Sequence, residues 1–167
     1  MSSAISPAPS PLALYVHWPF CVSKCPYCDF NSHVRESVDQ AAWARALQAD
    51  LAHEAGALPG RRLGSIFFGG GTPSLFSAAS IDRLLAGIRA RVALAPDAEI
   101  TLEANPGTFE RAKFAGFRDA GVNRLSLGIQ SFDDAKLSAL GRVHGGDEAH
   151  RAAELAIATF GNVNLDL

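Results

Sequence analysis

Three cysteines dominate the chemistry that this sequence can support. Cys21, Cys25 and Cys28 lie within eight residues and form the pattern C-x-x-x-C-x-x-C. Cysteine thiolates are soft ligands that suit zinc or an iron-sulfur cluster. An odd number of cysteines in one short stretch does not fit a disulfide framework, so the pattern indicates a metal or redox role. Free thiols of this kind also predict a reducing, cytoplasmic location.

The spacing of the cysteines alone is compatible with two kinds of metal centre. A closed structural zinc site needs four ligands, and His17 or His33 would have to supply the fourth. A 4Fe-4S cluster held by three cysteines leaves one iron without a protein ligand, and chemistry can take place there. We favour the cluster, because three thiolates match its needs without a fourth residue.

The residues around the cysteines indicate how they are positioned. Short β-branched or aromatic runs alternate with longer helical patterns, which predicts βα units. The expected strands are 12–18, 64–68, 99–104, 124–129 and 163–167, and the expected helices are 37–57, about 81–92, 108–121, 131–141 and 147–160. Ser37 with Gln40, and Ser131 with Asp134, have the spacing of capping boxes that open helices. Because no helix follows the fifth strand to cover it, we expect the domain to be incomplete at its C-terminal end.

Parallel α/β proteins bind ligands beyond the carboxyl ends of their strands, so the loops after the strands are the places to search. The cysteines follow the first strand, and Gly69-Gly70-Gly71-Thr72 ends the second. Glycines let the backbone approach a ligand closely and expose N–H groups, although a tight βα turn would also explain them.

Four further polar residues lie on or near the same predicted rim. Glu103 ends the third strand and can accept hydrogen bonds from hydroxyl or amino groups of a ligand, or be a surface carboxylate. Gln130 ends the fourth strand. Arg142 can pair with a ligand carboxylate or be solvated, and Asp166 on the last strand can be an interior or edge carboxylate.

Composition limits the possible partners. The 167 residues are 48% hydrophobic and 19% charged, which indicates a folded globular chain. The formal charge is −2, so there is no general basic field and nucleic acid is not an expected partner. Residues 1–11 are rich in Ser, Ala and Pro and are interpreted as a flexible leader before a core domain of residues 12–167. No apolar run approaches the ~20 residues needed to span a bilayer, so no transmembrane segment is expected.

The cysteine pattern on the loop after the first strand resembles the signature of the radical S-adenosylmethionine (SAM) superfamily. The resemblance implies an α/β fold, a partial TIM-like (β/α)6 barrel truncated after the fifth strand. It also implies that Cys21, Cys25 and Cys28 hold a 4Fe-4S cluster whose open iron is chelated by the amino and carboxylate groups of SAM. In that family an electron from the cluster cleaves the sulfonium and releases a 5′-deoxyadenosyl radical.

Longer blocks resemble one branch of the superfamily, which contains oxygen-independent coproporphyrinogen III oxidase and the haem chaperones. These blocks include YVHWPFC from Tyr15, FGGGTPS from Phe68, EANP from Glu103 and RLSLGIQSF from Arg124. Carried over position by position, the resemblance implies that SAM is contacted by Tyr15, Tyr27, Gly70, Gly71, Thr72, Glu103, Gln130, Arg142 and Asp166.

One position distinguishes the two members of this branch. The oxidase has a further cysteine two positions after the third, where this chain has Phe30. The chain is therefore more similar to the haem chaperones, which implies haem as a further ligand and a role in haem delivery, with catalytic activity left open. The alternatives are the oxidase itself and a zinc-stabilised binding module. Implied partners are haem or a porphyrinogen, an electron donor of the flavodoxin or ferredoxin type, and a protein that receives haem.

Overall fold

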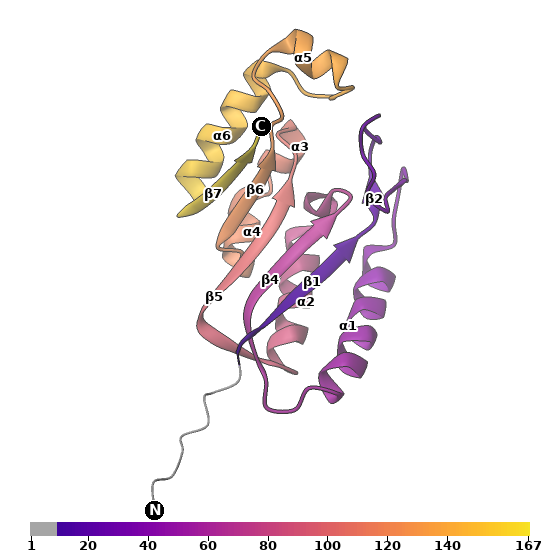
Figure 1. Ribbon diagram of the computed structural model, residues 1–167, viewed down its shortest axis with the longest axis vertical. Helices are drawn as coiled ribbons and strands as arrows, with labels where there is room; N and C mark the ends of the chain where they lie inside the picture. Colours follow the sequence, from indigo (N-terminus) through magenta and orange to yellow (C-terminus); the bar gives the residue numbers. More distant parts are fainter. Residues whose placement is uncertain (1–9) are drawn as a thin grey trace, which may run out of the picture.

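The computed structural model describes residues 10–167, without the side chains of residues 108 and 109, so residues 1–9 of the predicted leader lie outside the described residues. Figure 1 shows the arrangement of the elements. The strands are β1 (Leu12–Trp18), β2 (Phe20–Cys21), β3 (His33–Val34), β4 (Arg62–Gly70), β5 (Ala93–Ala104), β6 (Arg124–Gly128) and β7 (Asn162–Asp166). The helices are α1 (Gln40–Gly56), α2 (Ala78–Arg89), α3 (Thr108–Arg111), α4 (Phe114–Ala120), α5 (Asp134–Ala139) and α6 (Gly146–Thr159), with a short 3-10 turn η1 (Pro73–Leu75).

The five main strands form one parallel sheet in the order β1-β4-β5-β6-β7. Each strand pairs with the next main strand along the chain, so the order does not reverse as it does in an open doubly wound sheet. The helices between the strands pack on one side of the sheet, which curves as in a barrel wall (Figure 1). This arrangement confirms the predicted partial barrel of parallel strands with outer helices.

Alternating residues along each strand divide the sheet into two chemically different faces. Ile66 on β4, Leu102 on β5 and Leu127 on β6 point towards the helices and are completely or almost completely buried in the apolar core. On the concave face, β5 and β6 contribute polar side chains such as Glu103 and Ser126, whereas β1 and β4 contribute the stacked rings of Tyr15 and Phe67. The apolar face holds the helices on the sheet, and the polar face leaves the inside of the curve available for a ligand.

Aromatic packing fixes the point where β1 leaves the sheet. Trp18 is almost completely buried and its ring centroid lies 3.9 Å from that of Phe76, which follows η1. Edge-to-face contacts join Trp18 to Phe20 at 5.0 Å and Phe20 to Trp43 of α1 at 5.2 Å. These contacts hold the start of the segment that carries the three cysteines, residues 19–35 and here called the cysteine loop, against the core.

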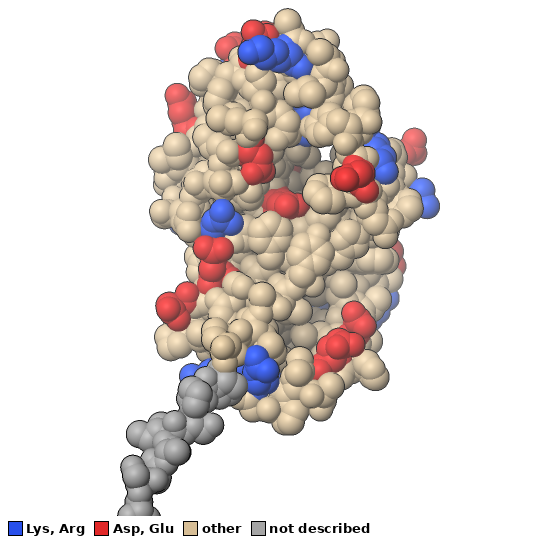
Figure 2. Space-filling view, viewed as in Figure 1, with Lys and Arg blue, Asp and Glu red and all other residues tan. Residues whose placement is uncertain are grey.

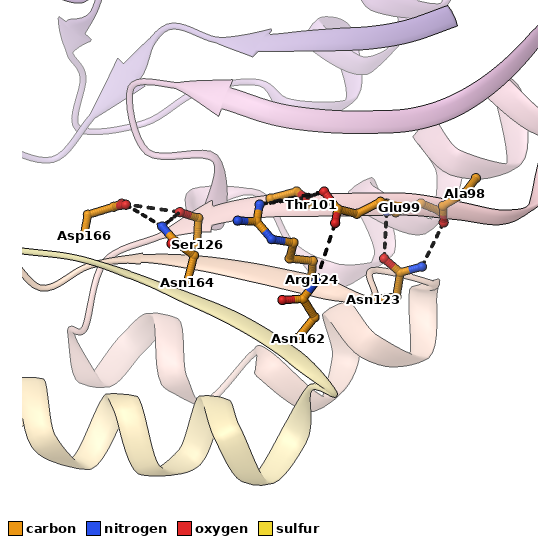
Figure 3. Close-up of polar contacts among 10 residues, drawn as sticks. Ala98, Glu99, Thr101, Asn123, Arg124, Ser126, Asn162, Asn164 and Asp166 are labelled. Carbon is orange, nitrogen blue, oxygen red and sulfur yellow. Dashed lines mark hydrogen bonds and ion pairs between the residues drawn. The ribbon is translucent and has the colours of Figure 1, made fainter. Parts of the chain in front are cut away.

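Hydrogen bonds cross the strands on the concave face (Figure 3). Arg124 donates to the Thr101 hydroxyl at 3.3 Å and forms an ion pair with Glu99 at 3.8 Å. Nearer the carboxyl ends of the strands, Ser126 and Asn164 both donate to the Asp166 carboxylate, at 3.3 and 2.6 Å. The network reduces the cost of leaving polar side chains inside the curve of the sheet.

The predicted strands are all present, but both predicted capping boxes are wrong. Asp39, not Ser37, caps α1 by accepting from the backbone N–H of Ala42. Asp133, not Ser131, caps α5 by accepting two backbone N–H groups. Both helices begin two residues later than predicted, and the negative charge of each Asp also interacts favourably with the positive end of the helix dipole.

The expected helix over residues 108–121 is interrupted, giving α3 and α4. Between them Lys113 extends its ammonium to the carbonyls of Ser74, Leu75 and Phe76, at 2.8 to 3.2 Å, and so joins this segment to η1. Burial lowers the pKa of Lys113 to about 8. The sequence pattern gave no sign of this long-range contact, nor of the short β2–β3 pair that closes the cysteine loop.

None of the helices in the described part of the chain has the length and apolar character needed to cross a bilayer.

Asn123 provides a test of how β6 is held in register. Its side chain accepts from the Ile100 N–H at 2.7 Å and donates to the Ala98 carbonyl at 2.9 Å (Figure 3). We expect Asn123→Ala to lower the free energy of unfolding by ~1–3 kcal/mol, because two backbone groups of β5 lose their partner. Urea denaturation measures the loss. Asn162→Ala, which removes one 3.5 Å contact at an exposed position, is the matched control and should change the stability little; equal losses would contradict this role of Asn123.

Candidate functional site

The loops at the carboxyl ends of the strands surround one cavity of about 430 Å³. Figure 2 shows a hollow in this face of the molecule with acidic side chains beside it. The predicted site residues that line the cavity are Cys21, Cys25, Tyr27, Cys28, Gly70, Gly71, Thr72, Glu103, Gln130, Arg142 and Asp166. Eleven of the twelve residues expected to hold the cluster or SAM therefore line a single space.

Tyr15 is the predicted residue that does not line this cavity. Its ring is half-exposed on the concave face, stacked on Phe67 with 6.0 Å between centroids, and its hydroxyl lies 3.5 Å from His17 Nδ1. Burial and the nearby Glu103 carboxylate raise the pKa of the Tyr15 hydroxyl. Tyr15 thus lies on the concave face outside the lining of the cavity.

The cysteine loop is held to the sheet by its own backbone. The N–H of His33 donates to the Pro19 carbonyl at 2.7 Å, and the N–H of Arg35 donates to the Cys21 carbonyl at 3.2 Å, so the loop is closed at its base. Inside the loop, Lys24 donates to the carbonyls of Phe30 and Ser32, both at 3.4 Å. All three cysteines are free thiols.

Two glycines let β4 approach this loop. The N–H of Gly71 donates to the Trp18 carbonyl at 2.6 Å, and a Cβ on Gly71 would lie 2.6 Å from the Phe20 carbonyl oxygen and 3.0 Å from Cys21 Sγ. Gly70 has a φ of +114°, and a Cβ there would clash with His17. The glycine run is therefore required by the packing of the chain against itself, in addition to any close approach by a ligand.

Arg142 connects several parts of the cavity wall. Its Nη1 donates to Tyr27 Oη at 3.3 Å and to Cys25 Sγ at 3.5 Å. Its Nη2 donates to Asn105 Oδ1 at 2.8 Å and to the Gly128 carbonyl at 2.7 Å. A guanidinium in this position places positive charge beside the Cys25 thiol and can also pair with an anionic group in the cavity.

Gln130 adopts an unusual backbone conformation at the end of β6. Its φ of 62° is the one positive value at a non-glycine position among the described residues. Its backbone N–H donates to the Asp166 carbonyl at 2.7 Å, and its side-chain Oε1 accepts from Tyr27 Oη at 3.3 Å. Left-handed backbone at such a residue costs about 1–3 kcal/mol and is concentrated at functional sites.

Two residues that line the cavity, Glu103 and Tyr27, have shifted protonation equilibria. Burial raises the pKa of Glu103, and the nearby Asp166 carboxylate raises it further. The N–H of Gly70, which donates to the Glu103 carboxylate at 3.2 Å, acts in the opposite direction. Burial also raises the pKa of Tyr27, while the adjacent Arg142 opposes the shift. A cationic group bound beside Glu103 and Asp166 would relieve the unfavourable charge there, so this side of the cavity suits an ammonium or sulfonium.

The arrangement of the thiols bears on which metal centre fits. Among residues 10–167, no three His, Cys, Asp or Glu side chains are grouped closely enough to hold a single metal ion. The donor set that lines the cavity is three free thiols, which suits a cluster with one iron open to a ligand and leaves a four-ligand zinc site incomplete. His17 contacts the Asn31 carbonyl at 3.1 Å, His33 lies on β3, and neither lines the cavity.

Sequence reasoning missed several residues of the cavity. Asn105, Lys24, Ser126 and Phe30 also line it. Asn105 had the clearest available signal, since it is a polar side chain directly after β5. Its partners, Thr72 and Arg142, come from other loops and are not apparent from the sequence.

Comparison with known proteins agrees with this geometry. The profile of the Radical SAM superfamily matches residues 15–165. The chain is 52% identical over 159 residues to the protein named Heme chaperone HemW of Escherichia coli, and covers 42% of that protein's length. It is 45% identical over 165 residues to Radical S-adenosyl methionine domain-containing protein 1, mitochondrial, of Bos taurus, and covers 37% of its length. These alignments include 94% and 97% of this chain.

Solved structures show the same fold. The coproporphyrinogen III oxidase (HemN) of E. coli, described as a radical SAM enzyme, superposes with a TM-score of 0.82 at 30% identity, over 93% of this chain and 37% of the oxidase. The cobalamin-dependent SAM radical enzyme OxsB superposes with a TM-score of 0.60 at 15% identity, a likeness of fold alone. From the profile match over residues 15–165, the chain belongs to the radical SAM superfamily, and haem chaperones are among its close relatives.

Proposed function

We propose that this chain is the cluster- and SAM-binding domain, from residue 12 onwards, of a haem chaperone. The observation that carries the proposal is the cavity itself. Its lining contains three free cysteines together with Arg142, Glu103 and the glycines at positions 70 and 71. In this proposal Cys21, Cys25 and Cys28 hold a 4Fe-4S cluster. When bound, the cluster would supply the electron that cleaves the sulfonium of SAM.

The residues of the cavity offer complementary groups for SAM, which carries an ammonium, a carboxylate, a sulfonium and a ribose. Glu103 and Asp166 are the acceptors for cationic and hydroxyl groups. Arg142 is the cation for the carboxylate, and it already faces the cavity from the loop after α5. The Tyr27 hydroxyl donates to Gln130 Oε1 at 3.3 Å, and these two side chains line one side of the cavity. Tyr15 is proposed as a further SAM contact from the family resemblance, although it does not line the cavity.

Haem delivery is favoured over oxidase chemistry by two observations. Phe30, where the oxidase has a cysteine, is 58% exposed and lines the cavity mouth. Two relatives, at 52% and 50% identity, are named Heme chaperone HemW. We propose haem as cargo, with a flavodoxin- or ferredoxin-type electron donor and a haem-receiving protein as partners. The oxidase, which would remove hydrogen from propionate side chains with loss of carbon dioxide, is the alternative.

Loss of one thiol tests the cluster assignment. We expect Cys25→Ala to abolish 4Fe-4S assembly, because two thiolates do not hold the cubane. The measurement is iron and sulfide content, visible absorption and EPR after anaerobic reconstitution. Lys24→Ala, which removes two backbone contacts at 3.4 Å but no ligand, is the matched control and should retain most of the cluster. A colourless wild-type protein with one bound zinc would instead establish the zinc-stabilised module.

We expect the ionised Glu103 carboxylate to lower the stability of the ligand-free protein and to strengthen SAM binding. Because burial raises its pKa, the folded protein binds this proton more tightly than the unfolded chain does. Ionising Glu103 therefore lowers the stability of the folded protein. This loss is absent below the unfolded pKa of about 4.3, grows above it and is complete once the pH exceeds the folded pKa. We expect Glu103→Gln to raise the melting temperature of the ligand-free protein at pH 8 but not at pH 4.

The same variant should bind SAM at least about tenfold more weakly, because hydrogen bonds to charged groups contribute about 1.5–3 kcal/mol. Calorimetric titration of the reconstituted protein at pH 8 measures the affinity. Glu99→Gln alters a carboxylate of the concave face that does not line the cavity, and is the control. Unchanged SAM affinity in Glu103→Gln would remove Glu103 from the proposed site.

Haem delivery and oxidation make opposite predictions for the full-length protein. We expect it to bind haem, seen as a saturable change in the haem absorption spectrum, and to form no protoporphyrinogen from coproporphyrinogen III under anaerobic, reducing conditions with SAM. Formation of the divinyl product would establish the oxidase. Neither haem binding nor product would refute both functions while leaving the cluster assignment intact.

A further inference from the structure

Asn105 lies between the guanidinium of Arg142 and the hydroxyl of Thr72. Its Oδ1 accepts from Arg142 Nη2 at 2.8 Å, and its Nδ2 donates to Thr72 Oγ1 at 3.2 Å. Thr72 Oγ1 lies in turn 3.5 Å from Cys21 Sγ. Three side chains from the loops after β4, β5 and α5 therefore form one continuous chain of hydrogen bonds that ends on a cysteine sulfur.

The direction of this chain follows from the chemistry of its members. A guanidinium is donor-only, so the Asn105 atom that faces Arg142 must be the carbonyl oxygen. The amide nitrogen then faces Thr72 and donates to the hydroxyl oxygen. Thr72 has a single hydrogen, and with its oxygen already accepting from Asn105, that hydrogen is directed to Cys21 Sγ. A thiolate that ligates iron accepts hydrogen bonds and does not donate them, so it matches this direction.

The surroundings make these contacts strong. Thr72 is 6% exposed and Cys21 is 8% exposed, so the last contact of the chain is shielded from water. Thr72, Asn105 and Arg142 line both the main cavity and a neighbouring cavity of about 340 Å³, and so form part of the wall between them. Arg142 also donates directly to Cys25 Sγ at 3.5 Å. One guanidinium thus reaches two of the three cysteines, one directly and one through Asn105 and Thr72.

We propose that Asn105 is a positioning residue that fixes the Thr72 hydroxyl as a donor to Cys21 and thereby raises the reduction potential of the cluster. The proposal rests on the proposed function, since it requires that Cys21 is a cluster ligand. Hydrogen bonds to the sulfurs of an iron-sulfur cluster stabilise the reduced, more negative state and so raise the potential. Asn105 acts through Thr72 and needs no contact with SAM to do so.

The test compares the reduction potentials of variants that change the direction of the chain. Asp at position 105 accepts only, so in Asn105→Asp the Thr72 hydroxyl turns towards the carboxylate and Cys21 loses its donor. Thr72→Val removes the same donor without adding charge, and Thr72→Ser retains it. Each protein is reconstituted anaerobically without SAM and titrated with dithionite and redox mediators, and the reduced cluster is followed by EPR. Iron and sulfide content checks that the cluster is complete.

We expect a more negative potential in Asn105→Asp and Thr72→Val, by about tenfold in the reduced-to-oxidised ratio, or ~59 mV for one electron. Thr72→Ser should keep the wild-type potential. The double variant combines Asn105→Asp with Thr72→Val. Relative to Thr72→Val alone, Asn105→Asp should shift the potential less than it does in the wild type, because the hydroxyl is already absent and only the added negative charge acts. Equal shifts in both backgrounds, or an unchanged potential in Thr72→Val, would overturn the proposal.

Two outcomes separate this proposal from the function on which it rests. A wild-type protein that assembles no cluster refutes the proposed function. Clusters of equal potential in the wild type and all variants refute only the role of Asn105. If Thr72→Val does not assemble a cluster, Thr72→Ala removes the same hydroxyl with less bulk and gives the same comparison.

Discussion

The close contact between Gly71 and the backbone of the cysteine loop is the constraint on which the site depends. With 2.6 Å between the Gly71 nitrogen and the Trp18 carbonyl, and no room for a Cβ, β4 and the start of the cysteine loop are held as one unit. This contact places Cys21 beside Thr72, and Thr72 beside Asn105. The aromatic packing of Trp18 secures the same point from the other face of the sheet. The cavity is therefore built around a junction at which backbone contacts backbone.

The parallel winding of the sheet explains why distant residues meet there. Cys28 and Arg142 are far apart in sequence, yet both line the cavity, because every main strand delivers the loop that follows it to the same rim. The polar concave face continues this chemistry into the curve of the sheet, where Ser126 and Asn164 hold Asp166 in place. The apolar core lies between the helices and the convex face, so the concave face can carry polar groups.

The sequence was sufficient to predict the strands and the group of residues on the rim, because those depend on residue type and period alone. Cys21, Glu103 and Gln130 were identified as rim residues from their places after predicted strands, and they line one cavity. Features that arise from contacts between distant segments were not predictable. The break between α3 and α4 depends on Lys113 reaching η1, and the role of Asn105 depends on side chains from two other loops. The capping boxes failed because both helices begin two residues later than predicted, each at an aspartate that accepts from the first turn.

The left-handed backbone of Gln130 has a consequence for how this chain would change under selection. Glycine would relieve the backbone cost at that position, and selection for thermal stability alone would favour it. It would also delete the amide that accepts from Tyr27 and donates to the Asp166 carbonyl at 3.3 Å. At this position the stability of the fold and the proposed contact with a ligand therefore favour different residues, glycine for the first and glutamine for the second.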